Sequence, residues 1–137
     1  MYDAVAAEHG TIYGSGLVSA HTTPDVNDLV AQAMAQHRAN REAAITALAG
    51  RSVPAPLPAA GYQLPIDANN PGDAAKLALQ MEEETAVAWR AVAEQATTTE
   101  DRTLAVTALT DSAVLAARWR AVLGVTPAVV AFPGGTE

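Results

Sequence analysis

A long stretch without helical periodicity divides the sequence into two parts. The stretch, RSVPAPLPAAGYQLPIDANNPG at residues 51–72, carries five prolines and two glycines. Proline breaks helices and central strands because it has no amide hydrogen and a fixed φ. The stretch is also too apolar for a solvated linker. We therefore expect a crossover that lies against a helical core, with a helix pair on each side of it.

Start and stop signals predict two helices before the crossover and two after it. The first covers residues 3–21 and ends at HTTPDVND, where Thr23 can cap and Pro24 can begin a second helix that ends before Gly50. The third covers roughly residues 72–96, and TTTED offers a capped turn into the fourth, at about residues 100–123. The closing TPAVVAFPGGTE cannot continue a helix, so we expect it to dock as an extended tail.

Composition favours an all-α fold with a single domain over residues 1–137. Half of the residues are apolar but only 4% are aromatic, so Ala, Val and Leu must fill the core, which suits closely packed helices. Short turns and one long crossover predict two antiparallel helix pairs, the connectivity of a ferritin-like four-helix bundle. An up-and-down bundle is the alternative, but it needs no connection of this length.

The charge balance excludes several kinds of partner. The formal net charge is −7, with eight Lys and Arg residues against fifteen Asp and Glu. Binding to nucleic acid needs a basic face, and so does binding to an anionic membrane surface, so we expect neither partner. The chain has no cysteine, which excludes disulfides and thiolate chemistry. Without a targeting segment or a long apolar run, it is expected to be cytoplasmic.

Polar side chains interrupt the apolar faces of the first helix pair. The face of the first helix is predicted from Tyr2, Val5, Ile12, Tyr13 and Leu17. His9 bisects this face and Glu8 borders it, while His37 and Arg41 fall inside the apolar face of the second helix. Counted from the turn near residue 23, Glu8 and His9 lie at the depth of His37 on the antiparallel neighbour. We expect them to meet.

The second helix pair brings carboxylates to a similar level. Glu82 and Glu84 lie on opposite borders of the apolar face of the third helix, so either can turn inward. Asp111 borders the apolar face of the fourth helix, within about one helical turn of these glutamates when reflected through the turn near residue 98. Each helix thus directs a polar group toward the middle of the bundle.

Buried charges must be paired or bound to metal, and this leaves two interpretations. The first is a site for a single iron, manganese or zinc ion, which carboxylate and imidazole ligands suit. Its candidate ligands are Glu8, His9, His37, Glu82, Glu84 and Asp111. The second is a hydrogen-bonded network without metal, in which Arg41 is the central cation and Glu8 and Glu82 accept bonds from it and from the histidines.

Several stretches carry a family resemblance. AVAAEHGTIYGSG, QHRANREAAITAL, AAGYQLP and the closing AFPGGTE resemble an actinobacterial, mycobacterial-type family of uncharacterised ferritin-like proteins, a domain of unknown function. The resemblance covers nearly the whole chain. It implies a ferritin-like bundle with no assigned activity.

Ferritin-like proteins in the wider superfamily bind two metals through a Glu on the first and third helices and Glu-x-x-His on the second and fourth. The positions of this sequence that match are Glu8, His37, Glu82 or Glu84, and Asp111. Met34 stands where the second helix would carry its glutamate, and Val114 stands where the fourth would carry its histidine. The resemblance therefore implies a degenerate site with room for at most one metal.

Three function classes follow from these observations. The first is a non-catalytic structural or binding protein with a degenerate metal site, and we expect no enzyme activity. The second is a metal-binding ferritin-like protein or oxidase that uses iron or manganese. The third is a small-molecule binder that uses the apolar face beneath the crossover and the tail. A homodimer is also expected, because Trp89 with Val87 or Leu79 would leave an apolar patch on the third helix.

Overall fold

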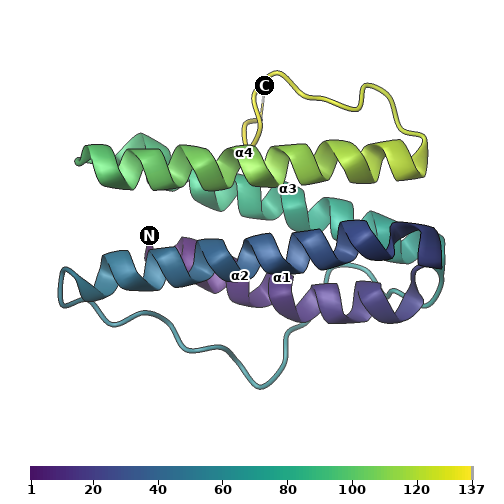
Figure 1. Ribbon diagram of the computed structural model, residues 1–137, viewed down its shortest axis with the longest axis horizontal. Coiled ribbons are helices and arrows are strands. Elements are labelled where there is room, and N and C mark those ends of the chain that lie inside the picture. Colours follow the sequence, from purple (N-terminus) through teal and green to yellow (C-terminus); the bar gives the residue numbers. More distant parts are fainter. Residues whose placement is uncertain (137) are drawn as a thin grey trace.

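The computed structural model describes residues 1–136, and within them the chain forms four long helices and no strand (Figure 1). The elements are α1 (Tyr2–His21), the 3-10 turn η1 (Pro24–Val26), α2 (Asn27–Ala49), α3 (Pro71–Gln95) and α4 (Thr99–Leu123). The predicted helices agree with these bounds to within one residue, except that the first turn of the second helix is 3-10. The all-helical prediction is confirmed.

Local side-chain chemistry explains where the second pair of helices begins. The Asn70 side chain accepts a hydrogen bond from the Asp73 amide at 2.9 Å, and the Thr98 hydroxyl accepts one from the Asp101 amide at 3.2 Å. Each bond satisfies an amide that a helix N-terminus leaves without a partner. Thr23, expected to cap in the same way, makes no such side-chain bond. Proline at position 24 begins that turn without it.

The helices pack as two antiparallel pairs, α1 with α2 and α3 with α4, and α1 also packs along α3 (Figure 1). Residues 50–70 contain no helix and run outside α1 toward the opposite end of the bundle (Figure 1). In this segment the ring of Tyr62 packs at a tilt against that of Tyr13 on α1, with ring centroids 5.4 Å apart. The segment thereby covers the outer side of α1.

Beyond α4, residues 124–136 turn back over α3 and α4 (Figure 1). Arg120 donates a hydrogen bond to the Ala128 carbonyl at 3.4 Å and pairs with Glu83 of α3. Gly134 adopts a φ of 72° and lies so close to α3 that an added Cβ would sit 2.5 Å from the Ala86 carbonyl oxygen. The tail therefore packs against α3 and α4, and its close approach to α3 requires a glycine at position 134.

Within the described residues the apolar core falls into two clusters, one toward each end of the bundle. The cluster near the turn between α1 and α2 includes Val18, Val30, Leu77, Leu115 and Trp119. The cluster near the turn between α3 and α4 includes Val5, Leu48, Trp89, Val92 and Ala105. Polar side chains occupy the level between the two clusters, so the middle of the bundle is not a hydrocarbon core.

Two expectations about apolar faces are wrong. Helix α1 exposes Tyr2, Tyr13 and Leu17 and buries mainly small and polar residues around Val5, because close packing against α2 and α3 leaves no room for large side chains at its centre. Trp89 of α3 is completely buried rather than part of a surface patch.

Among the described residues, no helix is long and apolar enough to span a lipid bilayer.

Two glycines of α1 provide a matched test of the close packing between α1 and α3. An alanine Cβ at Gly14 would overlap the sulfur of buried Met81, whereas one at Gly16 meets nothing within 4 Å. Both Gly14→Ala and Gly16→Ala remove a glycine from a helix, which favours the fold by about 0.5–1 kcal/mol. We expect Gly16→Ala to stabilise the protein by that amount and Gly14→Ala to destabilise it by about 1–3 kcal/mol through overpacking.

Urea unfolding of the two variants measures this difference directly. Equal stabilisation of both would show that Met81 moves aside freely and that α1 and α3 are not in tight contact at Gly14.

Candidate functional site: a buried carboxylate and histidine layer

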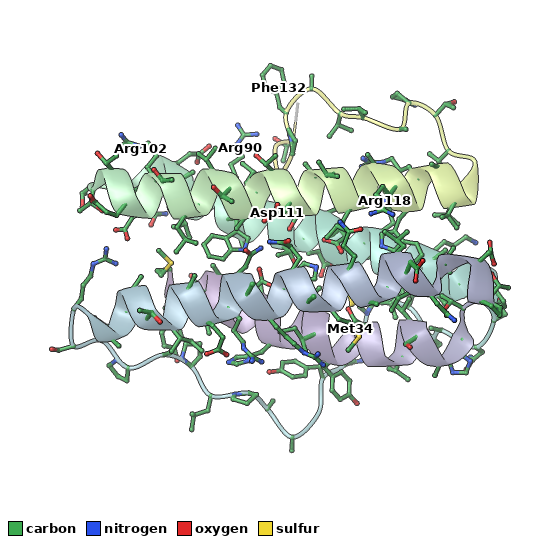
Figure 2. The ribbon with its side chains drawn as sticks, viewed as in Figure 1. Met34, Arg90, Arg102, Asp111, Arg118 and Phe132 are labelled. Atoms are coloured by element: carbon green, nitrogen blue, oxygen red, sulfur yellow. The ribbon has the colours of Figure 1, made fainter. Side chains whose placement is uncertain are left out.

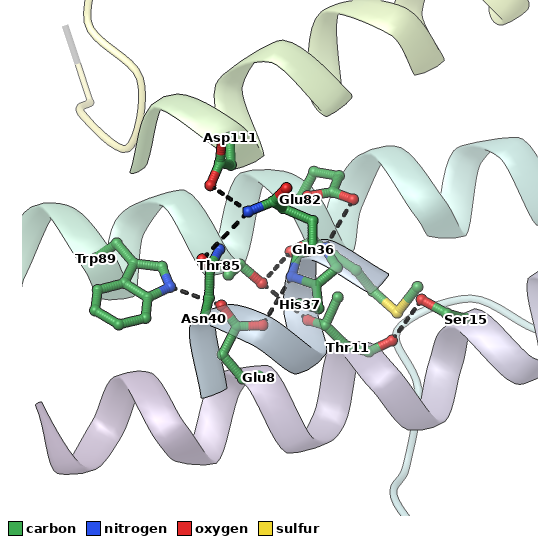
Figure 3. Close-up of polar contacts among 11 residues, drawn as sticks. Glu8, Thr11, Ser15, Gln36, His37, Asn40, Glu82, Thr85, Trp89 and Asp111 are labelled. Carbon is green, nitrogen blue, oxygen red and sulfur yellow. Dashed lines mark hydrogen bonds and ion pairs between the residues drawn. The ribbon is translucent and has the colours of Figure 1, made fainter. Parts of the chain in front are cut away.

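His37, at the middle of α2, bridges carboxylates from two other helices (Figure 3). Its Nδ1 lies 2.7 Å from Oε2 of Glu8 on α1, and its Nε2 lies 3.0 Å from Oε1 of Glu82 on α3. All three side chains are buried. With both ring nitrogens facing carboxylates, the imidazole donates two hydrogen bonds, which requires the protonated, cationic form.

The two carboxylates differ in how fully they are satisfied. The second oxygen of Glu8 accepts a 2.7 Å hydrogen bond from the indole N–H of Trp89 on α3, so each of its oxygens has a partner. Oε2 of Glu82 is buried and has no partner among the described residues. Glu8 is therefore the more fully hydrogen-bonded carboxylate of the pair, and it is held from two sides.

Burial and pairing shift the pKa values of this layer in a consistent direction. Burial alone lowers the pKa of His37, but the hydrogen bonds and charges of Glu8 and Glu82 outweigh it and raise the pKa to about 10. Burial raises the pKa of Glu82, and the neighbouring His37 offsets only part of that effect. His37 is thus a fixed buried cation at neutral pH, and Glu82 holds a proton more readily than an exposed glutamate.

A ladder of hydroxyl groups joins α1 to α3 beside the histidine (Figure 3). Ser15 donates to the Thr11 carbonyl at 2.8 Å, and the Thr11 and Thr85 hydroxyls lie 2.8 Å apart. Because Thr85 donates its proton to the Met81 carbonyl, Thr11 is the donor between the two threonines. These bonds satisfy the polar groups that the small buried residues of α1 bring into the core.

Helix α4 contributes a second, less complete set of polar contacts. Asp111 points from α4 toward α2 (Figure 2), and its Oδ2 accepts a 2.7 Å hydrogen bond from the Gln36 amide. The same amide lies 3.4 Å from Oδ1 of Asn40. The Asn40 amide nitrogen and the Ser112 hydroxyl are buried without partners among the described residues. Polar atoms from α2, α3 and α4 therefore remain unsatisfied in this part of the layer.

The structure brings together only part of the predicted site. Glu8, His37 and Glu82 meet as expected, and Glu82 rather than Glu84 faces the core. Glu84 is exposed and accepts a hydrogen bond from Gln80 at 2.9 Å.

Two further candidates are directed elsewhere. His9 is buried, but its Nε2 donates a 3.0 Å hydrogen bond to the carbonyl of Pro56 in the crossover. Arg41 is not the central cation: its guanidinium binds the neighbouring Glu42 at the surface. Arg41 lies one helical turn after His37, and its side chain extends toward water. A long side chain there keeps its charge solvated at little cost. The cation of the network is His37.

Sequence reasoning missed several members of the layer. Trp89 was expected in an apolar surface patch, although an indole N–H that becomes buried regularly requires an acceptor. Thr11 and Thr85 gave no signal because threonine at a single helical position is common on exposed and buried faces alike. Gln36 and Asn40, one turn apart on α2, could have been found by the same spacing argument that identified His37.

The donor set does not fit a metal ion. Both nitrogens of His37 are engaged with carboxylates on opposite sides of the ring, so in this arrangement the three side chains do not converge on one point. Within residues 1–136, no group of three or more His, Asp or Glu side chains is arranged to hold a metal. A proton on His37 fills the role that a metal would have in neutralising the two carboxylates.

These features define a helical-bundle protein with an ion-paired layer at mid-height. The chain belongs to the family described as a domain of unknown function (DUF4439), whose model matches residues 1–137. Among solved structures it is similar to the crystal structure of a conserved hypothetical protein, rv2844, from Mycobacterium tuberculosis. The two are 56% identical with a TM-score of 0.87, over 88% of this chain and 92% of that one. No curated protein matches the chain.

Removal of a carboxylate from the layer should be far more costly than removal of one outside it. Glu8→Ala leaves Nδ1 of His37 and the Trp89 indole without their acceptors, and we expect a loss of about 3–5 kcal/mol in the free energy of unfolding. Glu84→Ala, a matched change at an exposed position of α3, should cost less than about 1 kcal/mol. Urea unfolding at neutral pH compares the two. A small loss for Glu8→Ala would contradict a buried ion pair.

Stability should fall as the pH rises. The pKa of His37 is about 10 in the folded protein, against 6.5 for an ordinary histidine. The protonated His37 side chain therefore stabilises the fold by at most about 5 kcal/mol. This stabilisation is complete below about pH 6.5 and is lost as the pH approaches 10. The raised pKa of Glu82 acts in the same direction, because the folded state again holds the proton more tightly.

Urea unfolding between about pH 6 and pH 10 measures this loss. His21→Gln, near the end of α1, serves as the control and should keep the full pH dependence. An unfolding free energy that stays constant over this range would mean that His37 is neutral in the fold.

Proposed function

We propose that this protein is a single ferritin-like domain in which a proton-mediated ion pair replaces the metal centre, and that it acts as a non-catalytic binding or structural protein. The helix order and the long connection at residues 50–70 support the ferritin-like assignment. Glu8 on α1 and Glu82 on α3 match the single glutamates of that superfamily. Met34 and Val114 supply no ligand at two other positions.

The state of His37 carries the proposal. A metal binds the lone pair of a neutral imidazole, but here both nitrogens hold protons shared with Glu8 and Glu82. With the pKa of His37 at about 10, removal of one proton at neutral pH costs roughly 4 kcal/mol before any metal can bind. A dication would also have to break the hydrogen bonds that hold α2 to α1 and α3.

One observation favours the second candidate, a metal-binding protein. Oε2 of Glu82 is buried without a partner, and burial raises the pKa of Glu82, with a smaller contribution from the charges of Glu8 and of Asp111 on α4. Two carboxylates from facing helices are a common feature of ion sites. The set lacks a third anionic or imidazole ligand, so we rank this candidate below the non-catalytic one.

The remaining expectations are proposals of the same kind. We propose a cytoplasmic protein that binds no nucleic acid, consistent with its net charge of −7. We also propose a homodimer, on a smaller apolar patch than the one expected from the sequence, because Trp89 is not part of it. Val87 is exposed on α3 and Leu79 is half-buried there. Both residues border the same outer face of α3.

Incubation with ferrous iron and oxygen tests whether the layer is a metal centre. We expect no oxidation above the uncatalysed background, because His37 is protonated and two ligand positions carry Met34 and Val114. Protein purified without a chelator or affinity tag should also contain less than stoichiometric iron, manganese and zinc. Ferric absorbance and elemental analysis provide the measurements. Saturable oxidation that disappears in His37→Ala would establish the metal-dependent alternative.

A further inference from the structure

A groove lies on the outer side of α4, beneath the C-terminal tail. Its volume is about 470 Å³, within the range of small-molecule sites. Helix α4 forms one side and the tail forms the other. Its lining residues include Leu109, Val114, Ala117, Val129, Val130 and Pro133. An adjoining hollow shares Val130 and Pro133 and continues between the tail and α3.

The lining offers apolar contacts and few hydrogen bonds. Leu, Val, Ala and Pro side chains make up most of it, and several are well exposed, with Val129 at 71% and Val114 at 52%. The Thr110 hydroxyl is engaged, because it donates to the Val106 carbonyl at 2.7 Å. Water in such a groove gains little from the protein, so an apolar ligand would displace it favourably.

Arg118 is the one charged residue among the described residues that line the groove. Its exposed guanidinium hydrogen-bonds the neutral amide of Gln32 and forms no ion pair with a described carboxylate. Arg120, two residues later, is paired with Glu83. The chain as a whole has an excess of carboxylates, so an arginine without one, at the edge of an apolar groove, provides a charge for an incoming anion.

We propose that the groove binds a medium-chain aliphatic molecule with one anionic head group, such as a fatty carboxylate. The aliphatic chain of the ligand lies along α4 under the tail, and the head group of the ligand receives hydrogen bonds from Arg118. Binding here goes beyond the proposed function, and it is separable from it, because the groove is on the surface of α4 and contains no residue of the His37 layer.

Two probes that differ only in their head groups test the proposal. Dodecanoate and dodecanol are titrated into isotopically labelled protein below their aggregation limits, and amide chemical shifts are followed. We expect saturable one-to-one binding of dodecanoate, with shifts concentrated at Ala117, Val129 and Val130. Dodecanol should bind roughly three- to tenfold more weakly because it lacks the charge.

Variants separate the head-group contact from the apolar contact. Arg118→Gln should weaken dodecanoate binding roughly three- to tenfold and leave dodecanol unchanged. Arg102→Gln, on the far end of the same helix (Figure 2), should change neither and serves as the matched control. Ala117→Phe should block both probes by filling the groove.

A second pair of variants tests the wall formed by the tail. Gly134→Ala places a Cβ against the α3 backbone and should release the tail, which weakens binding of both probes. Gly124→Ala has a similarly positive φ but meets nothing within 4 Å, so it should retain binding.

Three results of the ligand titrations would overturn the proposal, and a fourth result, from the protein alone, would do so as well. The first is the absence of saturable shifts with dodecanoate, and the second is a set of shifts scattered over the whole surface. The third is equal binding of dodecanoate to wild type and Arg118→Gln. If the groove amides instead shift with protein concentration alone, a second copy of the chain covers the groove and the ligand assignment is wrong.

Discussion

The bridge from Glu8 through His37 to Glu82 is the interaction on which the rest of the bundle depends. It joins α1, α2 and α3 at one level, and each of its members is removed from water. Two buried carboxylates without a cation between them would repel each other in a medium of low polarity. The protonated imidazole makes the arrangement tolerable, and its geometry allows one ring to serve two anions on different helices. The relative positions of these helices are therefore fixed by directional bonds and not by hydrocarbon packing alone.

The position of this layer explains the shape of the apolar core. One cluster, around Trp119, fills the bundle toward the turn between α1 and α2, and the other, around Val5, fills it toward the opposite end. Trp89 belongs to the second cluster and also donates to Glu8, so it connects hydrocarbon packing to the charged layer. Small residues of α1 allow the helices to approach closely enough for the hydroxyls of Thr11 and Thr85 to meet. The core is thus stabilised by burial at both ends and by paired polar groups at its centre.

The interior and the surface of the protein suit different tasks. Inside, both imidazole nitrogens of His37 are engaged with carboxylates, while buried polar atoms of Asn40, Glu82 and Ser112 have no partner among the described residues. Outside, the tail and α4 leave apolar side chains exposed beside Arg118. A protein of this kind binds other molecules most readily at its surface, where binding does not disturb the buried ion pairs. The tail, anchored through Gly134 and Arg120, forms one wall of the groove on α4.

The sequence by itself determined the helices and the long connection, because these depend on local chemistry. Proline is excluded from helix interiors but tolerated in the first turn, and the Thr98 side chain caps an amide only three residues away. Helical spacing and the turn near residue 23 were also enough to bring Glu8 and His37 to the same depth. Which glutamate of α3 turns inward, and that Arg41 turns outward, was decided only by the tertiary structure. In a chain this rich in alanine the hydrophobic pattern leaves each helix free to rotate by a few tens of degrees, and the packing of its neighbours fixes that angle.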